Sequence, residues 1–112
     1  MGFKMAETNL SKLQEQYGDR IQVNDDGSVT WTLSSPLATN DGSVATITLR
    51  RPKLKEIKRM KGGSDTEKTA WIISALSGIA PPFLDELDGE DFAVLGRIFA
   101  HFMGVSPVSG GE

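Results

Sequence analysis

Histidine is the side chain most often used for proton transfer near neutral pH, and this sequence has one, His101. It lies in an apolar segment, at helical spacing from Val94, Arg97 and Ile98. A metal site or a catalytic pair needs partner residues, and the chain has neither a second histidine nor a cysteine. We therefore interpret His101 as a structural or surface residue. The sequence predicts no catalytic residue, no bound metal and no cofactor, and hence a protein that is not an enzyme.

An acidic run near the C-terminus raises the question of calcium binding. It comprises Asp85, Glu86, Asp88, Glu90 and Asp91. If Gly89 were the glycine of an EF-hand loop, Leu84 would take the first position and Leu95 the twelfth, where Asp and Glu are required. The run is therefore predicted to cap a helix and to form a solvated acidic face.

A basic run lies in the middle of the chain, and only Glu56 offsets it. Its members are Arg50, Arg51, Lys53, Lys55, Lys58, Arg59 and Lys61. Such a run can contact phosphates, but no aromatic residues are interleaved with it and the whole chain carries a net charge of −3. We favour a solvated face, paired with the acidic run, or a protein contact over nucleic acid.

These charged runs must be positioned by a small set of strands and helices. Apolar and polar residues alternate over Ile21–Val23, Val29–Leu33 and Ala45–Leu49, which is typical of half-buried strands. Asn24–Gly27 and Asn40–Gly42 carry the signals of tight turns. The pattern predicts a small antiparallel three-stranded β-meander with one apolar face.

The rest of the chain is predicted to be helical, which makes the fold class α+β. A first helix begins at Pro52, carries Leu54, Ile57 and Met60, and ends at Gly62-Gly63. A second begins with the capping-box pair Ser64 and Glu67 and ends at Gly78. After Pro81-Pro82 come a short turn at Leu84 and Leu87 and a last helix from Asp88 to Gly104. We expect these three to four helices to pack on one face of the sheet.

A chain of 112 residues with 38% hydrophobic residues is expected to form one domain. We predict that this domain covers residues 19–104. Residues 1–18 are predicted to be an N-terminal extension, either with a short helix over Thr8–Tyr17 or as a frayed terminus that orders only on contact with a partner, and residues 105–112 a disordered tail. No apolar run approaches the ~18 residues of a membrane span, and the start lacks the apolar region of a signal peptide. The absence of cysteine is consistent with a cytoplasmic location.

The last two main helices are apolar on more than one side. Trp71, Ile72 and Ile73 are consecutive and so point in three directions, and Val94 and Ile98 lie off the stripe of Phe92, Leu95, Phe99 and Phe102. One small sheet cannot bury all of these side chains. We expect the helices to pack on each other and some apolar area to face a partner.

Five short features follow one another in a set order over roughly half of the chain. The first is a strand that ends in Ile47–Pro52 and leads into the second, the basic helix Leu54–Met60. Next come a helix ending in Leu76–Ile79, the linker Leu84–Asp88 with Asp91, and an apolar helix ending at Phe102. In this order the chain resembles the tail assembly chaperones of Mu-like and P2-like contractile-tailed phages.

The resemblance implies a non-enzymatic protein that binds the tape measure protein and keeps it soluble while the tail tube assembles. It implies a phage or prophage protein in the cytoplasm of the bacterial host, absent from the mature virion, with no catalytic residues to carry over. The apolar candidates for partner contact are Trp71, Ile72, Leu95, Ile98 and Phe99, and the basic ones, adding charge complementarity, are Arg51, Lys55, Lys58 and Arg59. Ile98→Asp is expected to weaken this binding and to leave the fold intact.

Two other classes of function stay open. The chain would be a small nucleic-acid-binding regulator if residues 50–61 contacted phosphates, with binding that weakens steeply as salt is added. It would be a self-assembling structural tail component if it formed rings or tubes. A homo-oligomer is compatible with the chaperone as well.

Overall fold

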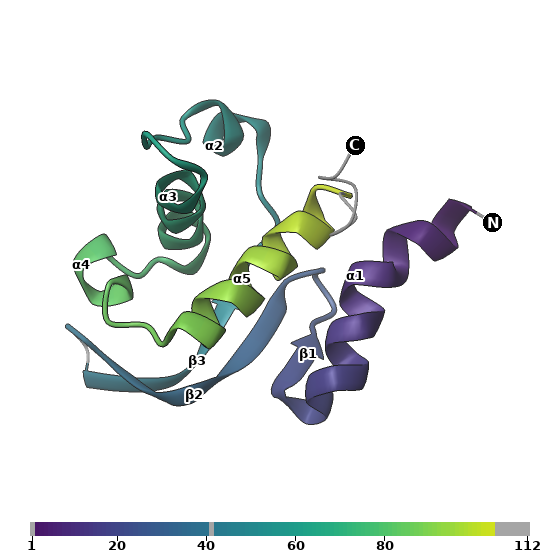
Figure 1. Ribbon diagram of the computed structural model, residues 1–112, viewed down its shortest axis with the longest axis horizontal. Coiled ribbons are helices and arrows are strands. Elements are labelled where there is room, and N and C mark those ends of the chain that lie inside the picture. The colour runs from purple at the N-terminus through teal and green to yellow at the C-terminus, as the bar shows by residue number, and fades with distance from the viewer. Residues whose placement is uncertain (1, 41, 105–112) are drawn as a thin grey trace.

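The computed structural model describes residues 2–40 and 42–104, so the tail predicted over 105–112 and residue 41 of the second turn lie outside the described residues. A helix precedes the sheet and four helices follow it (Figure 1). The elements are α1 (Gly2–Tyr17), the 3₁₀ turn η1 (Gly18–Arg20), β1 (Ile21–Val23), β2 (Val29–Thr39), β3 (Gly42–Leu49), α2 (Leu54–Lys58), α3 (Asp65–Ser77), α4 (Pro81–Leu84) and α5 (Gly89–Phe102). The strands form one antiparallel sheet in the order β1-β2-β3, which confirms the predicted α+β class and the meander.

The sheet has one apolar and one polar face, as the period-2 alternation predicts. Val29, Trp31 and Leu33 of β2 are buried, and Ile47 and Leu49 of β3 pair with Trp31 and Val29 on the same face. The opposite face is rich in threonine. There the hydroxyls of Thr30 and Thr48 lie 2.7 Å apart, within hydrogen-bonding distance across the two strands.

Strand β2 is longer than predicted, because it continues past an irregularity. Its register against β3 shifts between Thr32 and Leu37, where Ser34, Ser35 and Pro36 are exposed. Proline has no N–H to donate to a strand ladder, so it fits at such a bulge. After the bulge Leu37 returns to the core.

Helix α3 has the ends that its sequence predicts. Ser64 Oγ accepts a hydrogen bond from the N–H of Glu67 at 3.1 Å, and the Glu67 carboxylate accepts one from the N–H of Gly63 at 2.6 Å. Gly78 ends the helix in the left-handed conformation, with φ of 79°. Helix α2 differs from the prediction: Lys53 is its N-cap, so Pro52 precedes the helix, which ends at Lys58.

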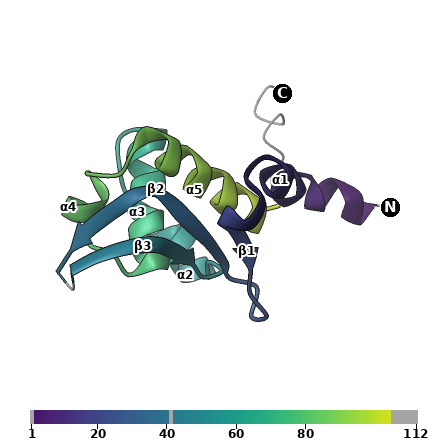
Figure 2. The same ribbon diagram turned by 90° about the horizontal axis from the view of Figure 1, so that it is seen from below.

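Helices α3 and α5 cover the apolar face of the sheet, and α1 packs against α5 (Figures 1 and 2). The short helices α2 and α4 lie on the two sides of α3 (Figure 1). Among the buried residues are Ile72, Ile73, Val94 and Ile98, which lie in one cluster with the sheet residues. The surplus of apolar side chains is therefore largely absorbed, because the helices bury one another as well as the sheet.

Helix α1 is longer than the predicted Thr8–Tyr17 helix and contributes to the core. Leu13 is fully buried, and the Tyr17 ring meets Trp31 edge-on with 4.9 Å between ring centroids. That residues 1–18 form an extension remains a prediction, but the C-terminal half of α1 packs against the rest of the domain. None of the helices in the described part of the chain combines the length and apolarity that crossing a bilayer requires.

Candidate partner-binding surfaces

Three of the predicted contact residues lie inside the core. Ile72, Leu95 and Ile98 are each 0% exposed. They belong to the buried stripe that holds α3 and α5 against the sheet, so the intact fold does not offer them to a partner. The expectation that Ile98→Asp leaves the fold intact is also wrong on physical grounds, because the change would place an unpaired carboxylate in a fully buried site.

The other predicted contact residues lie at the surface or at its margin. Trp71 and Phe99 are half-buried and pack against the edge of the core. Arg51, Lys55 and Lys58 are exposed, as is Arg59. The fold therefore separates the nine predicted residues into three core residues and six that a partner can reach.

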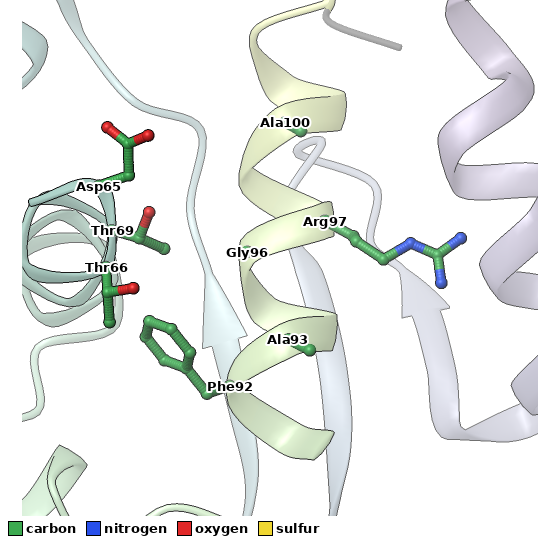
Figure 3. A pocket seen from close by; sticks show the side chains of 8 residues that line it. All are labelled: Asp65, Thr66, Thr69, Phe92, Ala93, Gly96, Arg97 and Ala100. Atoms are coloured by element: carbon green, nitrogen blue, oxygen red, sulfur yellow. The ribbon is translucent and has the colours of Figure 1, made fainter. Parts of the chain in front are cut away.

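A groove runs between α3 and α5 on the side of the helices away from the sheet (Figure 3). We call it the α3–α5 groove; its volume is about 390 Å³ and it is lined by Asp65, Thr66, Thr69, Phe92, Ala93, Gly96, Arg97 and Ala100. The Phe92 ring projects from α5 toward α3, whereas the guanidinium of Arg97 points away from α3 (Figure 3). The groove is open because α5 presents small residues along its outward side.

Gly96 lies in the middle of this groove, inside a regular helix. Its φ is not positive, so the backbone conformation does not require glycine. A Cβ at this position would meet Thr69 Cγ2 at 3.6 Å, an ordinary contact. Sequence reasoning missed Gly96, Thr66 and Thr69 as surface candidates. The available signal was a helix-weakening glycine in an otherwise strong helical pattern.

A second hollow, the Trp71 cavity, lies on the other side of α3. Its volume is about 260 Å³, and it is lined by Lys61, Gly62, Glu67, Ala70, Trp71, Pro81, Leu84 and Asp85. Lys61 comes from the connection after α2 and Asp85 from the end of α4, so opposite charges lie in the walls around an apolar floor. A third hollow, of about 270 Å³, shares Ala70 with this cavity and Phe92 with the α3–α5 groove, and so lies between the two.

The basic run forms an outward-facing cationic surface, because its one acid is withdrawn into an ion pair. Glu56 is 8% exposed and accepts hydrogen bonds from Arg50 Nη1 and from the N–H of Lys53, each at 2.9 Å, with a further short contact to Arg50 Nη2. The Arg50 hydrogen bonds, supported by the Lys53 N–H, lower the pKa of Glu56 to about 2, although burial opposes the shift. We call the six exposed cations that remain the basic surface: Arg51, Lys53, Lys55, Lys58, Arg59 and Lys61.

The acidic run does not neutralise this surface within the chain, contrary to the pairing considered from the sequence. Asp85, Glu86, Asp88 and Glu90 are exposed, and we call them the acidic surface. Among the described residues the ion pairs are Arg20–Asp91 and Arg50–Glu56, and neither joins the two surfaces. No residue between positions 69 and 96 is basic. Neither surface is therefore neutralised by an ion pair with the other within one molecule.

Asp91, the remaining member of the acidic run, has a different role. It is 1% exposed and lies in the first turn of α5, where its carboxylate accepts from the Trp31 indole at 2.9 Å and from the Ser34 N–H at 3.0 Å. Arg20 stacks over the Trp31 ring at 4.3 Å and donates to the carbonyl of Thr32 at 3.0 Å. These contacts set the position of α5 on β2, and hence of one wall of the α3–α5 groove.

No group of three or more histidine, cysteine or acidic side chains among the described residues could hold a metal ion. His101 lies near Phe102, with 6.0 Å between ring centroids. The features that the structure brings together are grooves and charged surfaces, which suit the binding of macromolecules.

Comparison with protein families identifies the chain. The model for "phage tail assembly chaperone proteins, E, or 41 or 14" matches residues 30–104, from strand β2 to the end of α5. Searches of curated proteins and of solved structures found no significant match. The family match covers more than half of the 112 residues and includes both walls of the α3–α5 groove. The chain belongs to the phage tail assembly chaperone family.

Proposed function

We propose that this protein binds the tape measure protein and keeps it soluble while the tail tube assembles, without catalysing a reaction. The observation that carries the proposal is the α3–α5 groove, an open and largely apolar surface that the chain's own core leaves uncovered. Family membership supports a partner in tail assembly. We further propose that the protein acts in the cytoplasm of the bacterial host and is absent from the finished virion.

The chemistry of the groove suits an amphipathic helix. Ala93, Gly96 and Ala100 lie at spacings of three and four along α5, so they form one low ridge that lets a helix backbone approach closely. Phe92 offers a large apolar surface at one end. A helix that lays its apolar stripe into such a groove is held by side chains repeating every three to four residues.

The proposed mechanism is transient shielding. A long helical protein with an exposed apolar stripe aggregates when the stripes of different molecules meet. When the apolar stripe binds in the α3–α5 groove, the stripe is removed from water until the tube subunits replace the chaperone. Because the core is complete without the partner, binding requires no unfolding of α3 or α5.

Co-expression with the neighbouring tail genes, followed by affinity capture of this chain, tests the proposal. The wild-type protein is expected to recover a long, helix-rich protein and to keep it in the supernatant. Ala93→Arg places a long cation on the exposed ridge of the groove and should reduce recovery about tenfold or more. Ala38→Arg makes the same change at an exposed position of β2 and should leave recovery unchanged.

The outcomes separate this function from its rivals. Equal recovery by wild type and Ala93→Arg would exclude the α3–α5 groove as the binding site. Capture of no such protein, with the tape measure equally soluble in the absence of this chain, would exclude the chaperone function. Detection of the chain by mass spectrometry in purified virions would favour a structural tail component.

A further inference from the structure

Part of each charged surface borders the α2–α3–α4 side of the molecule, whereas Arg51 packs over Phe102 of α5 and Glu90 contacts Ser34 of β2. Figure 1 shows α2 and α4 on the two sides of α3. The Trp71 cavity lies between them, with Lys61 of the basic surface and Asp85 of the acidic surface in its lining. We propose that this side is the interface of a two-fold symmetric homodimer, in which the basic surface of each copy meets the acidic surface of the other.

The argument for a second copy rests on charge complementarity within a single side of the molecule. A two-fold axis through the Trp71 cavity turns each charged surface onto the opposite one. It therefore forms the same attractive contact twice. Lys61 of each copy would face Asp85 of its partner, and the half-buried Trp71 would lie at the centre of the contact. Leu54, which is 69% exposed among the cations, adds apolar area to the same surface.

The same observations disfavour nucleic acid as the occupant. Phosphates drawn to the basic surface would lie close to Asp85 in the opposite lining of the cavity, and Glu86 follows directly in the chain. The exposed acids would repel them, whereas a second copy presents acids to the cations and cations to the acids. The proposal concerns self-association alone and does not depend on what the α3–α5 groove binds.

Sedimentation equilibrium of the full chain at low and high salt tests the interface. A dimer is expected at about 0.05 M salt, and at about 1 M salt, where the Debye length falls to about 3 Å, it should dissociate. Lys61→Glu and Asp85→Lys should each raise the dimer Kd about tenfold, because the symmetry repeats each reversed contact. Lys12→Glu and Glu15→Lys make the same charge changes at exposed positions of α1 and should leave the Kd unchanged.

Mixing the two cavity variants is the decisive test of the proposed contact between Lys61 and Asp85. The Lys61→Glu protein mixed with the Asp85→Lys protein should form a heterodimer, because opposite charges face each other again. A chain that stays monomeric at low salt, a dimer insensitive to both variants, or growth beyond two subunits would each overturn the proposal. Binding of a labelled nucleic acid duplex by a monomeric chain at low salt would overturn it in favour of a phosphate-binding role.

Discussion

The indole N–H of Trp31 donates a hydrogen bond to the carboxylate of Asp91 at 2.9 Å, and both side chains are almost completely buried. This bond joins the first part of strand β2 to the first turn of helix α5, across 60 positions of sequence. The same carboxylate accepts the N–H of Ser34 at 3.0 Å, within the bulge in β2. One side chain therefore satisfies the buried donor of Trp31 and the partly buried donor of Ser34, and it positions the helix that forms a wall of the α3–α5 groove.

Asp91→Ala is expected to lower the free energy of unfolding by about 3 kcal/mol, because it leaves the donors of Trp31 and Ser34 without an acceptor. Urea denaturation followed by far-UV circular dichroism measures the effect. Asp88→Ala is the matched control, since Asp88 is exposed and makes no capping hydrogen bond, and it should cost about 0.5 kcal/mol or less. Equal losses for the two variants would contradict the role of Asp91.

Glu56 should make stability depend on pH in the acid range. Its pKa in the folded state, about 2, lies below its ordinary value of 4.5, so the ionised carboxylate stabilises the fold above about pH 4.5. This contribution is lost as the pH falls from about 4.5 toward 2. We expect it to be about 1–2 kcal/mol, because the Arg50 side chain is 48% exposed and solvent screens the pair.

Glu56→Gln provides the comparison for this pH dependence. The variant should be less stable than wild type at pH 7, and the difference in unfolding free energy should shrink as the pH approaches 2. Glu86→Gln, at an exposed position, should match wild type throughout. A difference for Glu56→Gln that does not change between pH 7 and 2 would show that the carboxylate charge is not what stabilises α2.

Gly96→Ala should stabilise the protein and weaken partner binding at the same time. Alanine in a helix interior is favoured over glycine by about 0.5–1 kcal/mol, and its Cβ makes only an ordinary contact with Thr69. The added methyl group narrows the α3–α5 groove, so recovery of the partner should fall as the melting temperature rises. Gly78→Ala is the opposite control: at φ of 79° the side chain is strained, and stability should fall by about 1 kcal/mol.

Leu13→Ala tests whether helix α1 is part of the folded domain. Leu13 is fully buried, so its truncation should cost about 3 kcal/mol in unfolding free energy, through lost burial and the cavity left behind. Lys12→Ala, next to it and exposed, should cost about 0.5 kcal/mol or less. A cost below about 1 kcal/mol for Leu13→Ala would indicate that α1 is an appendage that the domain does not need.

Much of the fold follows from local patterns in the chain. The alternation around Val29–Leu33 and Ala45–Leu49 predicted the paired strands, and the capping pair Ser64 and Glu67 with Gly78 predicted both ends of α3. These predictions succeeded because turn and capping chemistry acts over a few residues. The bulge at Ser34–Pro36 was missed because a register shift depends on the neighbouring strand β3. The start of α2 was missed because it depends on Glu56, whose carboxylate accepts the N–H of Lys53 and pairs with Arg50.

The binding surfaces depended much more on tertiary structure. Apolar character correctly marked α3 and α5 as the important helices, yet it could not tell Ile72, Leu95 and Ile98, which are buried, from Trp71 and Phe99, which lie at the margin. Which side of an apolar helix faces water is decided by the helices packed against it. Likewise, the sequence indicates that Asp91 is one more acid of a solvated run. It becomes a buried hydrogen-bond acceptor only because the fold brings Trp31 and Ser34 of β2 against it. The types and order of the elements were local properties of the sequence, while burial and the pairing of charges were set by contacts between distant segments.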